Sequence, residues 1–135
     1  MKSEVLWPGK AVSSSKIFIY GSLLEDCCNH HVIASAKKLF DAQTKPEYDL
    51  IDLGEYPALV SGGAVSVKGS VYEISLDLLA VLDEFEDHPD MYRRTDIELL
   101  DGQIVQTYLF PRSLLWAQTP VDSGDWRAYV VARQT

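Results

Sequence analysis

The sequence has few cysteines, and the two that it has, Cys27 and Cys28, are neighbours. Adjacent cysteines rarely form a disulfide with each other, and two thiolates side by side lack the spacing of a zinc site. His30 and His31 are adjacent too, so their rings point in different directions, which is poor geometry for a metal. We therefore expect neither a disulfide nor a metal ion, and we interpret the cysteines as small apolar residues of a helix.

Basic residues are scarce relative to acidic ones. The chain has 12 Lys and Arg against 20 Asp and Glu, which gives a net charge of −8 at pH 7. The basic residues are dispersed, and Lys37-Lys38 and Arg93-Arg94 are only pairs. Binding to a phosphate backbone needs clustered Lys and Arg, so we expect no nucleic-acid partner.

Long apolar runs are also missing. Near the start, three apolar residues at positions 5–7 are followed by Pro8-Gly9 and Lys10, which is not the pattern of a secretory signal peptide. No stretch approaches the roughly 20 apolar residues of a membrane-spanning helix. We expect a cytoplasmic protein with no membrane partner.

The 135 residues, 47% of them hydrophobic, are enough for one domain with a single sizeable core. Residues 1–16 lack periodicity and include a run of three serines, so we predict an N-terminal arm there. Residues 17–135 show no internal repeat and no second boundary. We predict that they form a single domain.

Short apolar segments alternate with turn signals along this domain. Ser75 is typical of a helix N-cap, and Asp101-Gly102 is typical of a two-residue hairpin turn. A bulge or bend is expected near Gly69. Many short strands with two helices indicate an α+β fold with a small curved sheet or barrel. We predict helices at residues 29–39 and 76–86, and strands at residues 17–20, 48–53, 65–74, 92–100, 103–110 and 126–132.

Four acids cluster at the end of the second predicted helix, and helix geometry separates them. At about 100° per residue, Glu86 projects beside the apolar stripe of the helix, whereas Glu84 projects to the opposite side. Asp83 and Asp87 lie toward the margin of the stripe. Burial raises the pKa of a carboxyl, which suits a general acid–base group near neutral pH. A carboxyl that accepts structural hydrogen bonds fits this position equally well.

A second feature is Tyr20-Gly21-Ser22-Leu23, where an apolar strand runs into a glycine turn. Backbone N–H groups in such a turn are not used by a sheet, and they can converge on a negatively charged oxygen. Many buried strands end in a glycine turn. The segment gains meaning only when it is combined with the acidic helix end.

In combination and order, these segments resemble the γ-glutamylcyclotransferase family, most closely its γ-glutamylamine cyclotransferase branch. The resemblance is carried by Tyr20-Gly21-Ser22-Leu23 and by Leu82-Asp83-x-x-Glu86, followed by Pro89 and Met91-Tyr92-Arg93-Arg94. It extends over most of residues 17–127 and implies a small mixed β-barrel flanked by helices. In one departure, many members have glycine after the glutamate, where this chain has Asp87.

The resemblance also implies an activity. The enzyme would release 5-oxoproline and a free amine or amino acid, by attack of the substrate's α-amine on its own side-chain amide. Glu86 would be the catalytic residue, first as base and then as acid. Tyr20, Gly21, Ser22 and Leu23 would bind the γ-glutamyl group, and Tyr92 would line the pocket, although core packing suits Tyr92 as well. No cofactor and no metal would be needed.

Two functions from other classes stay open. One is a catalytically inactive small-molecule-binding or regulatory domain of the same fold, and the other is a scaffold whose acidic surface binds a basic partner. A Ser-His-Asp hydrolase is disfavoured because the chain has no Gly-x-Ser-x-Gly elbow. We expect a small-molecule γ-glutamyl substrate, and the sequence leaves its leaving group and the oligomeric state open.

Overall fold

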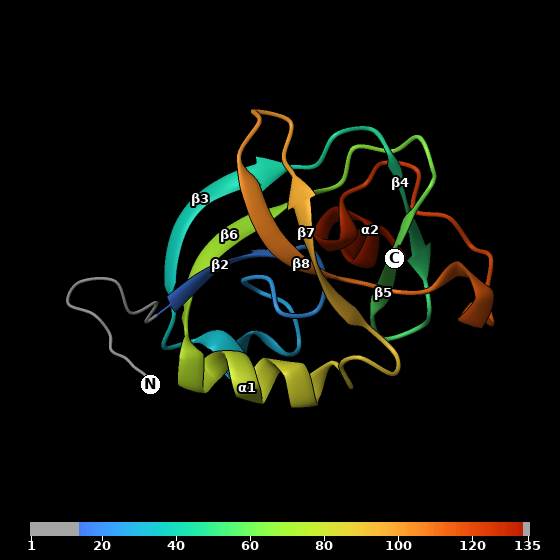
Figure 1. Cartoon of the computed structure of the whole chain (residues 1–135). Helices are drawn as coiled ribbons and strands as arrows, with labels where there is room; N and C mark the ends of the chain where they lie inside the picture. Colours follow the sequence, from blue (N-terminus) through green and yellow to red (C-terminus); the bar gives the residue numbers. More distant parts are fainter. Residues whose placement is uncertain (1–13, 134–135) are drawn as a thin grey trace.

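The computed structural model describes residues 14–133, and its main element is a five-stranded mixed sheet (Figure 1). The central strand β2 pairs antiparallel with β6 and parallel with β8. The predicted α+β class is therefore confirmed. The strands stand in the order β3-β6-β2-β8-β7, with the bounds Ser14–Ile19 (β2), Lys37–Gln43 (β3), Lys68–Ser75 (β6), Arg93–Glu98 (β7) and Ile104–Leu109 (β8).

This sheet curls strongly but does not close. Its two edge strands, β3 and β7, meet at one end, where Thr44 bridges Leu99 and the N–H of Leu100 donates to the Gln43 carbonyl at 2.9 Å. Along the rest of their length, the described residues form no ladder between these two strands. The expected barrel is thus an open, barrel-like sheet.

A two-stranded ribbon stands beside the sheet. It consists of β4 (Tyr48–Asp52) and β5 (Pro57–Ser61), which pair antiparallel, and β4 confirms the strand expected at residues 48–53. The N–H of Phe110, just beyond β8, donates to the Leu59 carbonyl at 2.8 Å. This bond holds the ribbon, and Pro57 at its start, next to the end of β8.

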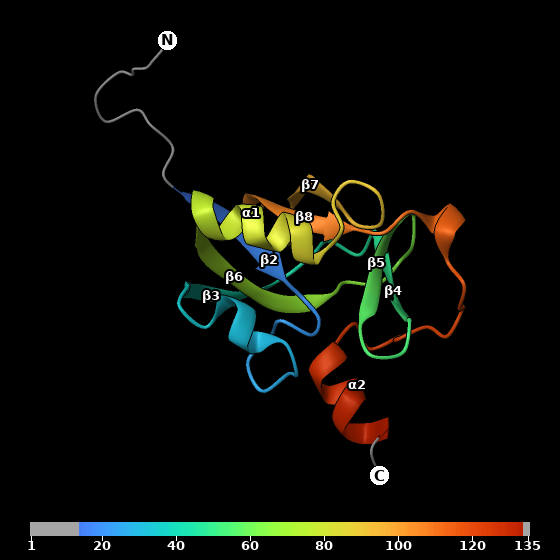
Figure 2. The ribbon, with the colours of Figure 1, turned by 90° about the horizontal axis from the view of Figure 1, so that it is seen from below.

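Alternate side chains of β2 enter two apolar clusters. Ile17 and Ile19 pack with Leu82 of helix α1 (Leu76–Phe85), whereas Phe18 and Tyr20 pack with Trp126 of helix α2 (Trp126–Arg133). Successive residues of a strand point to opposite faces, so a single strand serves both clusters. The two helices accordingly lie on opposite sides of the molecule (Figure 2).

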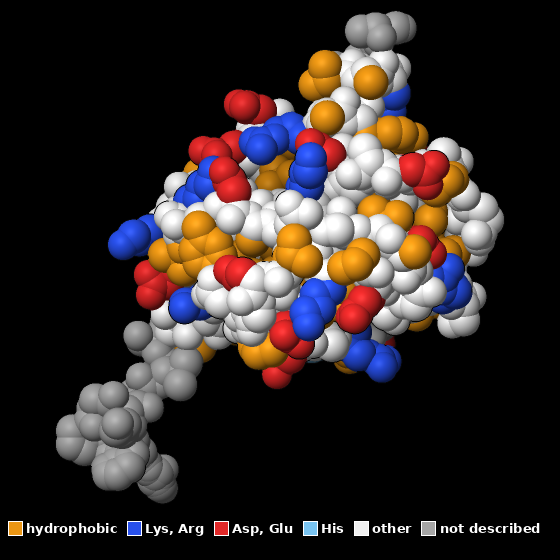
Figure 3. Space-filling view, turned by 90° about the horizontal axis from the view of Figure 1, so that it is seen from above, with side chains coloured by type: hydrophobic (Ala, Val, Ile, Leu, Met, Phe, Trp, Pro, Cys, Tyr) orange, Lys and Arg blue, Asp and Glu red, His pale blue; other side chains and the backbone are white. Residues whose placement is uncertain are grey.

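The surface carries both signs of charge. On the face seen from above, acidic and basic side chains are interspersed (Figure 3). Within residues 14–133, no helix has the length and apolar character needed to cross a membrane.

Helix α1 and the β7–β8 hairpin form where local signals predicted them. The Ser75 hydroxyl caps α1 by accepting a hydrogen bond from the Leu78 N–H at 3.2 Å. At the hairpin turn, Asp101 Oδ1 accepts from the Gln103 N–H at 3.0 Å, and Gly102 has a φ of 92°.

The strand predicted at residues 126–132 is wrong, because these residues form α2. Asp125 Oδ1 accepts a hydrogen bond from the Ala128 N–H at 3.1 Å, as an N-cap does. Trp126, Tyr129 and Val130 then recur at helical spacing and pack against one cluster. The apolar content that suggested a strand is the buried face of a helix.

The helix predicted at residues 29–39 is also wrong. Only a 3-10 turn, His30–Ile33 (η1), forms there, and Lys37 already belongs to β3. Pairing of β3 with β6 overrides the helical spacing of the apolar residues. Cys27 and Cys28 lie in the turns before η1, outside any helix, and both are free thiols.

Two further expectations change at β2 and β6. Strand β2 begins at Ser14, so Ser14–Lys16 of the predicted arm belong to the sheet, and residues 1–13 lie outside the described residues. Gly69 pairs with Ala42 in a regular part of the β3–β6 ladder and is not at a bulge. A Cβ at Gly69 would collide with the Ile19 carbonyl and the Phe18 ring, so this glycine allows β2 and β6 to approach closely.

Candidate active site

A cavity of about 290 Å³ brings together the residues singled out in the sequence. Its walls come from the turn after β2, the end of α1, the start of β5 and the chain before β7. The site residues predicted from the sequence that line it are Tyr20, Gly21, Ser22, Leu23, Glu86 and Tyr92. A larger and more open cavity, of about 530 Å³, contains none of them.

Glu86 is the residue that caps the C-terminus of α1. The N–H of Asp87 donates to the Glu84 carbonyl at 3.1 Å, and the N–H of His88 donates to the Asp83 carbonyl at 2.8 Å. This pair of bonds is a Schellman motif, which needs a left-handed residue after the cap. Asp87 adopts that conformation, with a φ of 55°. This explains why glycine suits the position after the glutamate in the family that the sequence resembles.

The carboxyl of Glu86 has no hydrogen-bond partner or ion pair among the described residues. Burial alone raises its pKa to about 7. The Tyr20 and Tyr92 hydroxyls also interact electrostatically with this carboxyl. Of the two interpretations left open by the sequence, a satisfied structural acceptor does not fit. Glu86 is a carboxyl available to a ligand, close to half ionised at neutral pH.

The turn at residues 20–23, which we call the donor loop, lines the same cavity as Glu86. Within the described chain, the N–H groups of Gly21, Ser22 and Leu23 donate to no protein acceptor. A Cβ at Gly21 would come within 2.7 Å of Pro57 Cδ, so a side chain has no room there. The loop therefore presents unused backbone donors to a cavity that also contains a carboxyl.

Three tyrosines brace the walls of the cavity. The Tyr20 hydroxyl donates to the Tyr108 carbonyl at 2.6 Å, and the Tyr92 hydroxyl donates to the Pro57 carbonyl at 2.7 Å. The Tyr108 hydroxyl donates to Asp83 at 2.6 Å. Burial raises the pKa of each phenol well above its usual value, so all three stay neutral. Tyr92 is both a wall and a core residue, because its ring also packs on Phe110.

Other contacts in and around the cavity were not evident from the sequence. Asn29, Phe85, Met91 and Tyr108 also line it. Asn29 carried no signal because its hydrogen-bond partner Ser22 lies across a loop, and Tyr108 carried none because its partner Asp83 is 25 residues away. Tyr56 and Pro57 are also among the lining residues. Near the cavity, Arg94 forms an ion pair with Asp83 at 3.5 Å.

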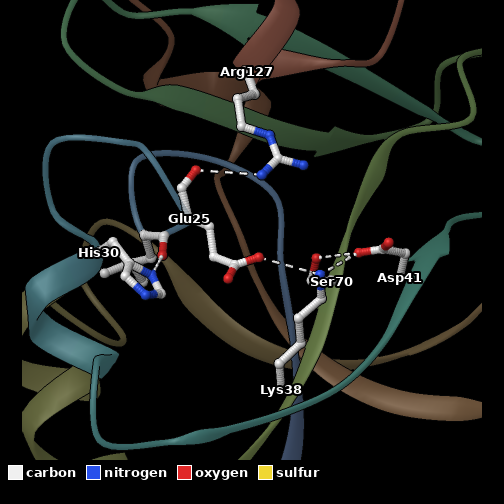
Figure 4. Close-up of polar contacts among 7 residues, drawn as sticks. Glu25, His30, Lys38, Asp41, Ser70 and Arg127 are labelled. Carbon is white, nitrogen blue, oxygen red and sulfur yellow. Dashed lines mark hydrogen bonds and ion pairs between the residues drawn. The ribbon is translucent and has the colours of Figure 1, made fainter.

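The chain that follows the donor loop is tied to the sheet and to α2 (Figure 4). The Glu25 carboxylate accepts from Lys38 at 3.2 Å, and the Glu25 carbonyl accepts from Arg127 at 3.3 Å. Lys38 also pairs with Asp41 at 2.9 Å, and Asp41 in turn accepts from Ser70. These contacts connect residue 25 with β3, β6 and α2.

No group of three or more His, Cys, Asp or Glu side chains within residues 14–133 is arranged to hold a metal ion. The cavity of the candidate active site has chemically useful groups of its own. It contains one carboxyl with a pKa near neutrality and a set of backbone donors. Such a site can move a proton and stabilise a negatively charged oxygen.

Comparison with known proteins agrees with this geometry. Residues 17–128 match the sequence model of the family described as "Gamma-glutamyl cyclotransferase, AIG2-like". The chain belongs to this family. The match includes the donor loop, α1 and the segment that contains Glu86 and Tyr92.

Individual relatives cover most of the chain. A protein of Vibrio cholerae serotype O1, provisionally named a gamma-glutamylcyclotransferase, is 41% identical over 110 residues, which are 82% of this chain and 93% of its own. The Danio rerio protein named Gamma-glutamylaminecyclotransferase A is 31% identical over 106 residues, covering 72% of this chain but 64% of the fish protein. The solution structure of YtfP from Escherichia coli superposes with a TM-score of 0.64 at 32% identity, covering 89% of this chain and 99% of that one.

Proposed function

We propose that this protein is a γ-glutamylcyclotransferase that acts on γ-glutamyl amines and releases 5-oxoproline and the free amine. Membership of the family supports cyclotransferase chemistry. The observation that carries the proposal is the unpartnered Glu86 carboxyl, with a pKa of about 7, in one cavity with the free N–H groups of the donor loop. A binding domain of the same fold would have no use for such a carboxyl.

In the proposed reaction, the substrate's α-amine attacks its own γ-carbonyl carbon. Glu86 takes a proton from the α-ammonium and exposes the nucleophilic lone pair. As the new C–N bond forms, the carbonyl π electrons move to oxygen, where the N–H groups of Gly21, Ser22 and Leu23 stabilise the charge. The attack is intramolecular, so the cavity needs only to hold the folded conformer.

The intermediate collapses when the carbonyl re-forms and the bond to the leaving nitrogen breaks. Glu86 delivers its proton to that nitrogen. In total the α-nitrogen, which becomes the ring nitrogen, loses two protons and the leaving nitrogen gains two. Glu86 transfers one of these protons and solvent transfers the other. The products are a neutral lactam and an ammonium ion, and Glu86 returns to its ionised form. A pKa near 7 suits a group that must both accept and return a proton.

The charges around the cavity favour amines over amino acids as leaving groups. Of the residues that line it in the described chain, the charged ones are Glu55, Glu86 and Asp87, and none is Lys or Arg. A leaving amino acid brings a carboxylate into this acidic surrounding, whereas a simple or cationic amine does not. The partly exposed rings of Tyr56 and Phe85 offer apolar and cation–π contacts to an alkyl ammonium group.

We also propose that the enzyme works in the cytoplasm. Both cysteines, Cys27 and Cys28, are free thiols, which suits a reducing compartment. The reaction as proposed needs no cofactor and no metal from outside the chain.

The test separates an enzyme from a binding domain. Purified protein is incubated with γ-glutamyl amines and γ-glutamyl dipeptides, 5-oxoproline is quantified, and thermal unfolding is followed with each compound. Release of 5-oxoproline, faster from amines, supports the proposal. A rise in the melting temperature without turnover by any compound would instead support the inactive binding domain.

A further inference from the structure

Asn29 holds Ser22 of the donor loop through two separate hydrogen bonds. Its side-chain Nδ2 donates to Ser22 Oγ at 3.0 Å, and its backbone N–H donates to the Ser22 carbonyl at 2.9 Å. Both residues line the cavity of the candidate active site. The two bonds join the ends of the segment between residues 22 and 29, and Ser22 at the start of this segment belongs to the donor loop.

The side-chain bond determines what the Ser22 hydroxyl can still do. A hydroxyl has one proton to donate and two lone pairs that accept. Asn29 occupies one lone pair, and no acceptor in the described chain takes the proton. Ser22 is only 8% exposed and lies at the cavity wall. Its proton is thus left for a group inside the cavity.

The next residue anchors the same loop a second time. His30 Nδ1 donates to the Leu23 carbonyl at 2.9 Å (Figure 4 labels His30). A carbonyl only accepts, so Nδ1 carries the proton. A carbonyl shares its peptide plane with the N–H of the next residue. The Asn29 bond to the Ser22 carbonyl therefore orients the Leu23 N–H, and the His30 bond to the Leu23 carbonyl orients the Leu24 N–H. Of the two anchors, only Asn29 also orients a side chain of the loop.

We propose that Asn29 is a positioning residue of this site. Its amide holds Ser22 Oγ so that the hydroxyl proton is presented, beside the backbone N–H groups, to the γ-carbonyl oxygen of the substrate. This inference rests on the proposed cyclotransferase function. Asn29 touches no reacting atom and acts through Ser22.

A double-mutant cycle tests the coupling. Asn29→Ala and Ser22→Ala are each expected to lower kcat about 10- to 100-fold with a smaller change in KM. Both weaken the hydrogen bond from the Ser22 hydroxyl to the substrate's γ-carbonyl oxygen, and this bond strengthens only as negative charge develops on that oxygen. The double variant is expected to be no slower than Ser22→Ala, since Asn29 then has no hydroxyl to orient. Independent, multiplying losses in the double variant would overturn the proposal.

Two further variants keep the test specific. Asn29→Asp places an acceptor where the amide donates, draws the Ser22 proton away from the cavity, and is expected to be slower than Asn29→Ala. His31→Ala, at an exposed neighbour of the same turn, is the matched control and is expected to keep wild-type kcat. Activity of Asn29→Asp equal to that of the wild type would contradict the assigned donor.

Loop order is measured without any substrate. Order parameters of the Ser22 side chain are expected to fall in Asn29→Ala, which removes the bond to Ser22 Oγ and keeps the backbone bond to the Ser22 carbonyl, and to stay at the wild-type value in His31→Ala. If the wild type forms no 5-oxoproline, the proposed function fails, and these order parameters still decide whether the Asn29 amide fixes the Ser22 hydroxyl. Unchanged order parameters in Asn29→Ala would overturn the positioning role, whatever the activity.

Discussion

Gly21 and Pro57 are packed so closely that a Cβ on Gly21 would lie 2.7 Å from Pro57 Cδ. This contact sets the donor loop against the start of β5, whose carbonyl at Pro57 accepts from the Tyr92 hydroxyl. The loop, the ribbon and Tyr92 therefore keep their places together. A change at Gly21 displaces a wall of the cavity as well as the loop itself.

Gly21→Ala is expected to destabilise the fold by about 1–3 kcal/mol, the usual range for overpacking. It should also lower kcat/KM strongly, since the backbone donors shift away from the carbonyl oxygen. Chemical denaturation and steady-state kinetics measure the two effects. Gly102→Ala, in the exposed hairpin turn, provides a control that affects stability through its positive φ and leaves activity intact.

Glu86 is expected to make stability depend on pH. Its folded pKa of about 7 is raised above the unfolded value of 4.5, so folding favours the protonated carboxyl. The stability linked to this proton is complete below pH 4.5 and is lost as the pH rises from 4.5 to 7. Glu86→Gln removes this loss, and its advantage over the wild type at pH 8 is expected to reach at most about 3 kcal/mol. Unfolding curves at pH 4.5 and 8 measure the difference, and equal stabilities at pH 8 would contradict the raised pKa.

Catalytic activity should rise with pH over the range in which stability falls. The carboxylate form of Glu86 is the base, so kcat/KM is expected to rise with pH through about 7. A profile of kcat/KM between pH 5 and 8 checks this. An inflection near 4.5 would mean that the catalytic carboxyl is not buried in the working enzyme.

Asp87 occupies a left-handed position that costs a non-glycine residue free energy. Asp87→Gly is expected to stabilise the protein by about 0.5–1 kcal/mol, whereas Asp87→Ala, which lacks both the freedom of glycine and the local bonding of Asp, should destabilise it. Thermal unfolding of the two variants provides the comparison. If Ala stabilised as much as Gly, charge removal rather than backbone strain would be the cause.

Three γ-glutamyl amides of equal length test the electrostatics of the cavity: those of 1,4-diaminobutane, butylamine and 4-aminobutyrate. With Glu55 and Asp87 at the cavity wall, kcat/KM is expected to fall in that order, by roughly 3- to 10-fold per step at low salt. The combined Glu55→Gln and Asp87→Asn variant should flatten the series. Glu84→Gln, which removes an exposed charge outside the cavity, should not. The same preference in all three proteins would rule out these two carboxylates as its cause.

Local chemistry predicted much of the fold. The Ser75 cap and the Asp101-Gly102 turn are decided within a few residues, and both the helix and the hairpin formed as expected. The side of α1 that Glu86 occupies also follows from helix geometry alone. The strand predicted at residues 126–132 is wrong because Trp126 packs in an apolar cluster formed by distant strands. This packing favours a helix over a strand.

The sequence did not predict Asn29 and Tyr108 as site residues, and the reason is the same for both. Asn29 bonds Ser22 seven residues away across an irregular turn, and Tyr108 reaches Asp83 across 25 residues. Neither pair has a periodic spacing that a sequence pattern reveals. The wrong prediction of a helix at residues 29–39 also made a contact between Asn29 and the donor loop unexpected, since a helical residue would not fold back on that loop.

The most direct measurement is 5-oxoproline release by the wild type, Glu86→Gln and Glu84→Gln with one γ-glutamyl amine. All three proteins should be fully folded at pH 7, because Gln conserves the shape of Glu at both positions and a neutral amide at position 86 is buried without a charge. We predict turnover by the wild type and by Glu84→Gln, and a loss of about 10²–10⁴-fold in Glu86→Gln. Turnover by a folded Glu86→Gln variant at the wild-type rate would contradict the central role of this carboxyl.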